Sequence, residues 1–260
     1  MSTNFSLFDP TSGFLVAQEE SSACRMSIRE DGDLRWMVSE DGVLHGAMSI
    51  SAPSKPVLPS INAMLFAENL RSNPERILCL GLGTGSIERY LAEAQPAAKI
   101  SSVEISQARY EQVQQHFGLP AGCTVILQDA KEVIESDIEL QDLIYCDLFD
   151  TSDRFNSMLS EHFIKGLCSK LSPFGVVAIN YVYEDQKHLI DTLVKLRSQV
   201  KNVAIAEIED HANIVIFGLN GELENQYQTY SAQQTAAKNV NADFLSNAIQ
   251  ITWLPQTLKA

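Results

Sequence analysis

Acidic residues recur at the points where predicted buried strands end. Glu104 and Asp129 each follow an apolar run, and Asp147 follows a third, with Asp150 three residues further along. The carboxyl ends of parallel strands meet at one edge of a sheet, which is the edge where open α/β sheets bind ligands. A carboxylate there can accept hydrogen bonds from hydroxyl groups, bind a cationic amine or remove a proton from that amine. The spacing therefore predicts a ligand-binding site that contains these acids.

A glycine turn precedes the acids in the sequence. The apolar run 77–80 leads into Gly81, Gly83 and Gly85, and helical spacing begins at Ile87. Glycine permits a sharp turn and close approach of a ligand, and the N–H groups at a helix start would face that ligand. The spacing is G-x-G-x-G rather than the G-x-G-x-x-G of dinucleotide sites, which favours ligands of the S-adenosylmethionine type. An ordinary tight turn between a strand and a helix is the alternative.

Each acid has a binding interpretation and a purely structural one. Glu104 lies 23 residues after the first glycine, a distance that favours bidentate binding of ribose hydroxyls over a solvated strand end. Asp129, followed by Ala130, is suited to accept a hydrogen bond from the exocyclic amine of adenine, to cap a helix, or to do both. Asp147 and Asp150 are suited to bind an amine and deprotonate it for attack on a sulfonium. For Asp150 a role as a turn residue is an equal alternative.

The elements that must position these residues alternate between strands and helices, which implies a parallel, doubly wound sheet. Predicted strands cover residues 76–80, 99–103, 123–127, 142–146 and 176–180, and predicted helices cover 87–94, 107–117, 130–135, 157–171 and 186–199. Two further strands, 203–208 and 213–219, must be antiparallel, because a parallel crossover needs about a dozen residues. We therefore predict an α/β fold with a Rossmann-like, seven-stranded sheet.

Two further parts flank the predicted Rossmann-like domain at 59–221. Residues 1–58 form a small β-rich N-terminal domain and linker, with hairpin signals at 31–32 and 41–42. A helix at 61–70 leads from this arm into the first strand of the sheet. Residues 222–260 form a polar tail that the pattern allows to be helical at 232–248.

Composition narrows the possible partners. The chain has 260 residues and a formal net charge of −14, which disfavours binding to a nucleic acid backbone. Its apolar runs are shorter than a membrane span, and its start lacks the pattern of a secretory signal. The five cysteines lack a C-x-x-C pair and the histidines lack metal-ligand spacing. We expect a cytoplasmic protein with no metal, membrane or nucleic acid partner.

Taken together, these motifs resemble the polyamine aminopropyltransferases, a spermidine synthase-like family with a class I methyltransferase type of sheet. The resemblance covers roughly residues 23–220 and rests on the turn 81–85, Glu104, Asp129-Ala130 and the run 147–150. It implies that the first three of these hold decarboxylated S-adenosylmethionine. It also implies that Asp147 and Asp150 hold a small-molecule amine and that Asp147 acts as general base. A homodimer formed through the β-rich arm is a further hypothesis by analogy.

The sequence departs from the family pattern in three places. Thr84 stands where the family's glycine loop has an Asp that holds the amine of the aminopropyl group. A neutral Thr84 also repels a carboxylate less, so undecarboxylated S-adenosylmethionine is a second candidate donor. The helix 61–70 lacks the family's Tyr-x-Glu run, and Asn180 stands where Gln is frequent. Aminopropyl transfer to a diamine is the leading hypothesis; methyl transfer to a small molecule and a non-catalytic nucleoside-binding paralogue are the alternatives.

Overall fold

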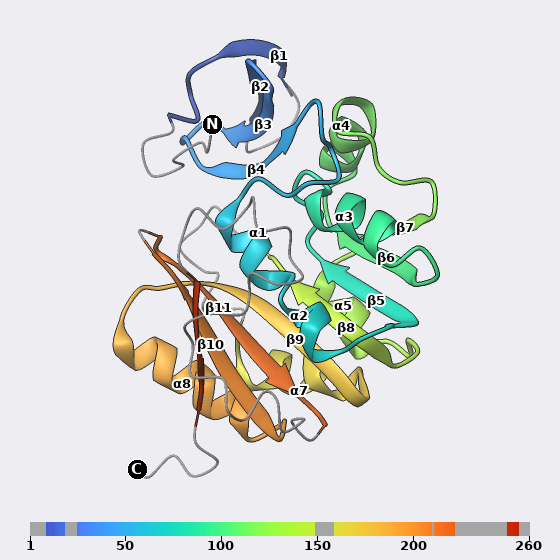
Figure 1. The fold of residues 1–260 in the computed structure, drawn as a ribbon, viewed down its shortest axis with the longest axis vertical. Helices are drawn as coiled ribbons and strands as arrows, with labels where there is room; N and C mark the ends of the chain where they lie inside the picture. Colours follow the sequence, from blue (N-terminus) through green and yellow to red (C-terminus); the bar gives the residue numbers. More distant parts are fainter. Residues whose placement is uncertain (1–8, 19–24, 149–158, 210, 222–248, 255–260) are drawn as a thin grey trace.

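The computed structural model describes residues 9–18, 25–148, 159–209, 211–221 and 249–254 (Figure 1). These residues form an α/β fold with two separate sheets. A small antiparallel sheet lies at the N-terminal end, and a larger mixed sheet with helices on both faces forms the rest (Figure 1). The α/β class and the β-rich N-terminal part are thus as predicted, whereas the domain boundaries stay a prediction.

The N-terminal sheet has four strands in the order β1-β2-β3-β4. The strands are β1 (Phe14–Gln18), β2 (Met26–Asp31), β3 (Leu34–Ser39) and β4 (Leu44–Ser49). Met26, Met37 and Met48 pack from one face of this sheet against Val113 and Phe117, which lie in or directly after the helix α4 (Gln107–His116). This shared apolar cluster joins the small sheet to the large one.

The large sheet has eight strands in the order β12-β10-β11-β9-β8-β5-β6-β7. Its strands are β5 (Arg76–Leu80), β6 (Lys99–Glu104), β7 (Cys123–Leu127), β8 (Gln141–Cys146), β9 (Leu171–Val182), β10 (Asn202–Ile208), β11 (Asn213–Leu219) and β12 (Ile249–Trp253). The strands β5 to β9 are parallel, and β11 pairs with β9 and β10 in the antiparallel sense. The predicted antiparallel pair at the end of the sheet is confirmed.

Helices cover both faces of this sheet. One face packs against α1 (Pro59–Met64), α2 (Ala67–Leu70) and α3 (Ser86–Ala94). The other face packs against α5 (Ala130–Glu135), α7 (Glu161–Ser169) and α8 (Gln186–Arg197). Among the described residues, no helix combines the length and the apolar character needed to cross a membrane.

The predicted strand number is wrong, because β12 adds an eighth strand. It pairs with β10 in the antiparallel sense, with Ile251 opposite Ala206 and Trp253 opposite Ala204. Ile251 is buried in the cluster on the α1 side of the sheet, and Trp253 packs against the same cluster. These five residues lie in a polar tail, and the sequence analysis predicted no strand there. Burial of the apolar side chains of Ile249, Ile251 and Trp253 explains why the segment pairs with β10. The helix predicted at 232–248 lies outside the described residues.

The single helix predicted at 61–70 is divided into α1 and α2. The N–H groups of Phe66 and Glu68 donate to carbonyls three residues earlier, at Ala63 and Leu65, which tightens the chain between the two helices. Leu65 and Phe66 are both buried. The residues 61–64 of α1 before them are buried as well, so the break lies within a continuous buried segment.

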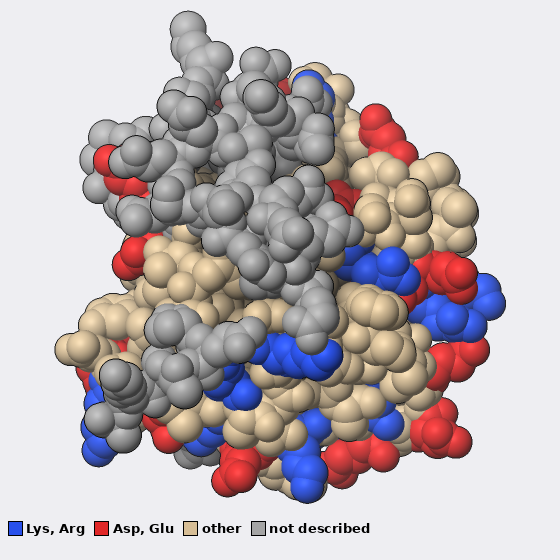
Figure 2. Space-filling view, turned by 60° about the horizontal axis from the view of Figure 1, so that its bottom comes forward, with Lys and Arg blue, Asp and Glu red and all other residues tan. Residues whose placement is uncertain are grey.

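Charged side chains of both signs are interspersed on the face shown in Figure 2. The chain as a whole carries 33 acidic and 19 basic side chains. A compact protein with this excess of acids repels polyanions at long range and attracts cations.

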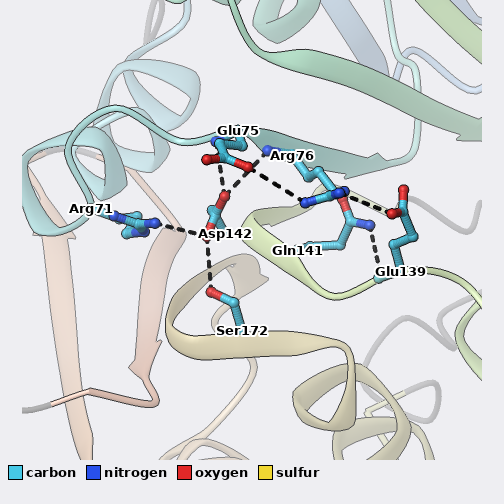
Figure 3. A network of polar contacts seen from close by, with 7 residues as sticks. All are labelled: Arg71, Glu75, Arg76, Glu139, Gln141, Asp142 and Ser172. Atoms are coloured by element: carbon cyan, nitrogen blue, oxygen red, sulfur yellow. Dashed lines mark hydrogen bonds and ion pairs between the residues drawn. The ribbon is translucent and has the colours of Figure 1, made fainter.

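A polar network fixes the edge of the sheet where the parallel strands begin (Figure 3). Asp142 of β8 accepts hydrogen bonds from the Arg71 guanidinium at 2.9 Å, from the Glu75 N–H at 2.8 Å and from the Ser172 hydroxyl at 2.9 Å. Burial alone would raise the pKa of Asp142, but these hydrogen bonds outweigh it and lower the pKa. The carboxylate therefore ties together the end of α2 and the starts of β5 and β9.

Candidate active site

A cavity of about 740 Å³ lies at the opposite edge of the large sheet, where its parallel strands end. Its wall includes Glu104 at the end of β6, Asp129 at the start of α5 and Asp147 after β8. The structure thus brings three of the four predicted acids to one cavity. Asp150, the fourth, lies outside the described residues. The roles of all four stay predictions.

The glycine turn forms one side of the cavity. Gly81, Gly83 and Thr84 line it, whereas Gly85 lies beyond it as the residue that caps α3. Gly81 has φ +93°, and a Cβ there would lie 2.2 Å from the carbonyl oxygen of Asp147. At Gly85, with φ +74°, a Cβ would lie 2.7 Å from the Leu119 side chain. These two glycines are therefore required by close protein neighbours as well as by the turn.

Thr84 faces the N-terminal sheet. Its side chain is 2% exposed, and a Cβ on Gly46 of β4 would lie 2.4 Å from the Thr84 Oγ1. The Thr84 Oγ1 is 3.1 Å from the Ser86 Oγ, which itself donates to the Ala47 carbonyl at 3.1 Å. The loop is therefore held against β4 by packing and hydrogen bonds. This contact limits the surface that Thr84 presents to the cavity.

Glu104 is buried and held by its own neighbours. Its side chain is 2% exposed, and its Oε1 accepts a hydrogen bond from the Ser106 N–H at 2.8 Å. The Arg109 guanidinium lies 3.4 Å from Oε1 and 3.5 Å from Oε2. Both contacts fix the orientation of the carboxylate. The Oε2 atom has the weaker contact and is the better placed of the two to accept a ribose hydroxyl.

Asp129 caps α5, as one of its two interpretations expects. Its Oδ1 accepts the Lys131 N–H at 2.8 Å. Asp129 also lines the cavity beside Ala130, whose small side chain is buried there. Capping uses one oxygen of the carboxylate, so an adenine amine could still bind to the other. The two interpretations are compatible in this geometry.

Asp147 lies at the far end of the cavity from Asp129. Its Oδ1 accepts a hydrogen bond from the Asn180 Nδ2 at 2.7 Å. The Asn180 Oδ1 in turn accepts one from the Asn213 Nδ2 at 2.9 Å. Burial raises the pKa of Asp147, and the bond from Asn180 opposes this only in part. A carboxylate with a raised pKa is a better proton acceptor than an ordinary surface aspartate.

His45, Arg109 and Asn213 are among the polar residues of the cavity that the sequence analysis did not predict. Burial and the nearby Arg109 lower the pKa of His45 to about 4, against the opposing effect of Asp41. The imidazole is therefore neutral near pH 7. Asn213 had a usable signal, because the start of an antiparallel strand lies at the same edge as the ends of its parallel neighbours. His45 had none, since only the tertiary fold brings β4 over the glycine turn.

The sequence is similar to curated polyamine aminopropyltransferases. No family model matches the chain. The polyamine aminopropyltransferase of Neisseria meningitidis serogroup B is 25% identical over 233 residues, which cover 86% of this chain and 84% of that protein. This chain is a homologue of the polyamine aminopropyltransferases. The predicted family resemblance is confirmed, and it extends over most of both chains.

Solved structures support the fold of this aminopropyltransferase homologue. A probable spermidine synthase from Corynebacterium glutamicum has a TM-score of 0.77 at 18% identity, and the match covers 92% of this chain and 90% of that one. A spermidine synthase in complex with the transition state analogue AdoDATO has a TM-score of 0.61 at 15% identity, over 80% and 74% of the two chains. Human methyltransferase-like protein 13 in complex with SAH has a TM-score of 0.58 at 23% identity, over 65% and 84%. The class I methyltransferase type of fold is thus shared by both kinds of enzyme.

Proposed function

We propose that this protein transfers the aminopropyl group of decarboxylated S-adenosylmethionine to a small amine, with a diamine such as putrescine as the leading acceptor. One observation carries the proposal. In a homologue of the polyamine aminopropyltransferases, a single cavity joins Glu104 and Asp129 to Asp147 past the glycine turn. An extended nucleoside donor and an amine acceptor would meet along this path.

The donor would lie across the glycine turn. Glu104 would accept hydrogen bonds from the ribose hydroxyls, and Asp129 would accept one from the adenine amine. Ala130 would leave room for the adenine ring. The turn residues 81–84 would lie beside the aminopropyl chain. This placement directs the sulfonium towards Asp147. Relatives of this fold are solved with SAH or AdoDATO, which supports a donor derived from S-adenosylmethionine.

Asp147 would then supply the base. An alkyl ammonium has no lone pair, so it must first give a proton to the Asp147 carboxylate. The neutral amine attacks the methylene carbon next to the sulfonium, the new C–N bond forms, and the C–S bond breaks with its electron pair on sulfur. Methylthioadenosine leaves, and one proton is released overall. Because the sulfonium carbon is already activated, the protein contributes mainly positioning and exclusion of water.

Methyl transfer from S-adenosylmethionine is the second candidate. It is favoured by the neutral Thr84 in the glycine turn and by the methyltransferase among the structures of similar fold. The acceptor would again lie at Asp147, but the donor would keep its carboxylate. The identity of the donor therefore separates the two activities.

The homodimer, the cytoplasmic location and the domain boundaries also stay proposals.

The test supplies each donor with a set of diamines and separates the products by chromatography. We expect a polyamine and methylthioadenosine from decarboxylated S-adenosylmethionine. Asp147→Asn should lower kcat by roughly 10²- to 10⁴-fold, since it removes the base and keeps the shape. Asp191→Asn, on the exposed surface of α8, is the matched control and should keep full activity. Methylated products from S-adenosylmethionine, with no polyamine formed, would overturn the proposal in favour of methyl transfer.

A further inference from the structure

Three polar side chains from three neighbouring strands form a line along the Asp147 end of the cavity. Cys146 of β8 pairs with Ile179 of β9, so the next residues, Asp147 and Asn180, follow side by side. Asn180 pairs with Val215 of β11, and Asn213 precedes Val215 by two residues. Residues two apart in a strand share a face of the sheet, so Asn213 is the diagonal neighbour of Asn180. All three residues line the cavity.

The chemistry of the three groups fixes the direction of their hydrogen bonds. An ionised carboxylate only accepts, so Asn180 must present its NH₂ group to Asp147. Its carbonyl oxygen then points to Asn213, which must donate. The Asn180 amide therefore has a single orientation that satisfies both neighbours. Hydrogen bonds in such a chain also polarise one another.

We infer that Asn213 is a positioning residue for Asp147 that acts through the side-chain amide of Asn180. Asn213 does not touch the carboxylate. It holds the Asn180 oxygen and thereby keeps the Asn180 NH₂ group directed at the Asp147 Oδ1. That bond stabilises the ionised carboxylate and leaves Oδ2 as the oxygen that would face the amine. The catalytic consequence rests on the proposed function, whereas the effect on Asp147 itself does not.

Loss of Asn213 would remove the partner that fixes the Asn180 amide. Asn180 could then turn its oxygen towards Asp147, where two acceptors repel each other. The ionised form of Asp147 would be less stable, and its pKa would rise.

The buried Cys146 thiol precedes Asp147 in the chain, and its pKa is raised to about 12, so it stays neutral. The other titratable groups that line the cavity are His45, Glu88, Glu104, Arg109, Asp129, Lys131 and His211. None of these is altered in the variants below.

The direct test is the pKa of Asp147, measured by NMR titration of ¹³C-labelled aspartate carboxyl groups. The Asp147 signal is assigned by its loss in Asp147→Asn. We expect the pKa to rise by about one unit in Asn180→Ala, which loses a hydrogen bond to a charged group. In Asn213→Ala we expect a rise of about half a unit, because only the support of that bond is lost. Asn213→Ser, which shortens the side chain but keeps it polar, should give the same rise and serves if Asn213→Ala does not fold.

Asn202→Ala is the matched control. Asn202, like Asn213, is an asparagine that begins a strand; it is buried, and its Nδ2 donates to the Gly221 carbonyl at 2.9 Å. It lies at the other end of the β10–β11 pair, opposite Leu219, and does not line the cavity. Its loss should cost stability without moving the pKa of Asp147. An Asp147 pKa that is the same in wild type, Asn213→Ala and Asn213→Ser would overturn the inference.

The kinetic test separates this inference from the proposed function. With decarboxylated S-adenosylmethionine and a diamine, the acidic limb of the kcat/KM profile should move to higher pH in Asn213→Ala by the same amount as the pKa of Asp147. The KM for the donor should be unchanged. If the carboxyl pKa rises but no diamine reacts, the role of Asn213 stands and aminopropyl transfer fails. If diamines react and neither the pKa of Asp147 nor the acidic limb moves, aminopropyl transfer stands and the role of Asn213 fails.

Discussion

Glu104 has two donors in the protein before any ligand binds. The Ser106 N–H and the Arg109 guanidinium fix its orientation, so this buried carboxylate is already ordered in the free protein. A ribose would therefore meet a preorganised acceptor, which lowers the entropy lost on binding. Preorganisation is the physical reason to place the ribose at this residue.

We predict that Glu104→Ala weakens binding of methylthioadenosine by roughly 1–3 kcal/mol, the range for lost hydrogen bonds to a charged group. Isothermal calorimetry measures the change. Glu139→Gln is the control, because Glu139 is exposed and pairs with Arg76 at the opposite edge of the sheet. An unchanged affinity in Glu104→Ala would mean that the ribose binds elsewhere in the cavity.

Thr84 is one of the three places at which the chain departs from the family pattern, and its contacts point to a structural role. Thr84→Val keeps the shape and removes only the hydroxyl that bonds to Ser86. We predict a loss of about 1 kcal/mol in the free energy of unfolding, measured by urea denaturation. The ratio of affinities for decarboxylated and intact S-adenosylmethionine should stay the same. A changed ratio would show that the Thr84 hydroxyl contacts the donor.

Asp142 acts on the scale of elements, since its carboxylate joins α2, β5, β8 and β9. Its pKa is lower in the folded protein than its ordinary value of 3.8. The stabilisation from its ionised form is therefore complete above that ordinary value and is lost as the pH falls through the lower, folded-state pKa. Asp142→Ala removes this contribution at neutral pH and leaves the Arg71 guanidinium without its carboxylate partner.

We predict that Asp142→Ala lowers the free energy of unfolding by roughly 2–4 kcal/mol at pH 7, as for a partly buried ion pair that loses one member. Denaturation at several pH values measures the effect. The difference from wild type should begin to shrink below about pH 4, where the carboxyl of the unfolded chain takes up a proton, and should keep shrinking until the pH has fallen through the lower pKa of the folded protein. A difference that is constant down to pH 3 would mean that packing, rather than charge, sets the loss.

The order of elements in the large sheet could be predicted because local signals determine it. Apolar runs, glycines and helical periodicity place most strands from β5 to β11 within a residue or so of their bounds. The exception is β9, which begins at Leu171, where the pattern predicted the end of a helix, and not at residue 176. The break between α1 and α2 could not be predicted in this way. It lies within a continuous buried segment, where Leu65 and Phe66 pack into the core and the centroids of the Phe66 and Phe217 rings are 5.8 Å apart. The strand β12 likewise depends on an open edge of β10 that no local pattern reveals.

In the candidate site, too, residues placed by local sequence signals could be predicted, and residues placed by tertiary packing could not. The acids could be predicted because each one follows a parallel strand directly, and such strands end at one edge. His45 and Gly46 could not, because they reach the cavity only when the N-terminal sheet packs on the glycine turn. The line from Asp147 to Asn213 is an intermediate case. Its members are near in the sheet but far apart in sequence, and only the register between β9 and β11 brings them together.

On the scale of the whole molecule, the cavity is closed by parts of both sheets. Leu44, His45 and Gly46 of β4 contribute one wall, and the strand ends of the large sheet contribute the other. Packing of Met48 with the α4 cluster and the bond from Ser86 to Ala47 hold the two walls together. A ligand that contacts both walls should stabilise this arrangement as a unit.

We predict that methylthioadenosine raises the unfolding temperature and slows amide exchange in both walls. At one hundred times its Kd, a ligand that binds only the folded state adds about 2.7 kcal/mol, or roughly 5 to 10 °C for a chain of this size. Exchange measured by mass spectrometry should slow in β4 as well as in the turn 81–85, while α8, which does not line the cavity, serves as the internal control. A rise in unfolding temperature with protection in the turn alone would show that the nucleoside is held by the large sheet without help from the N-terminal one.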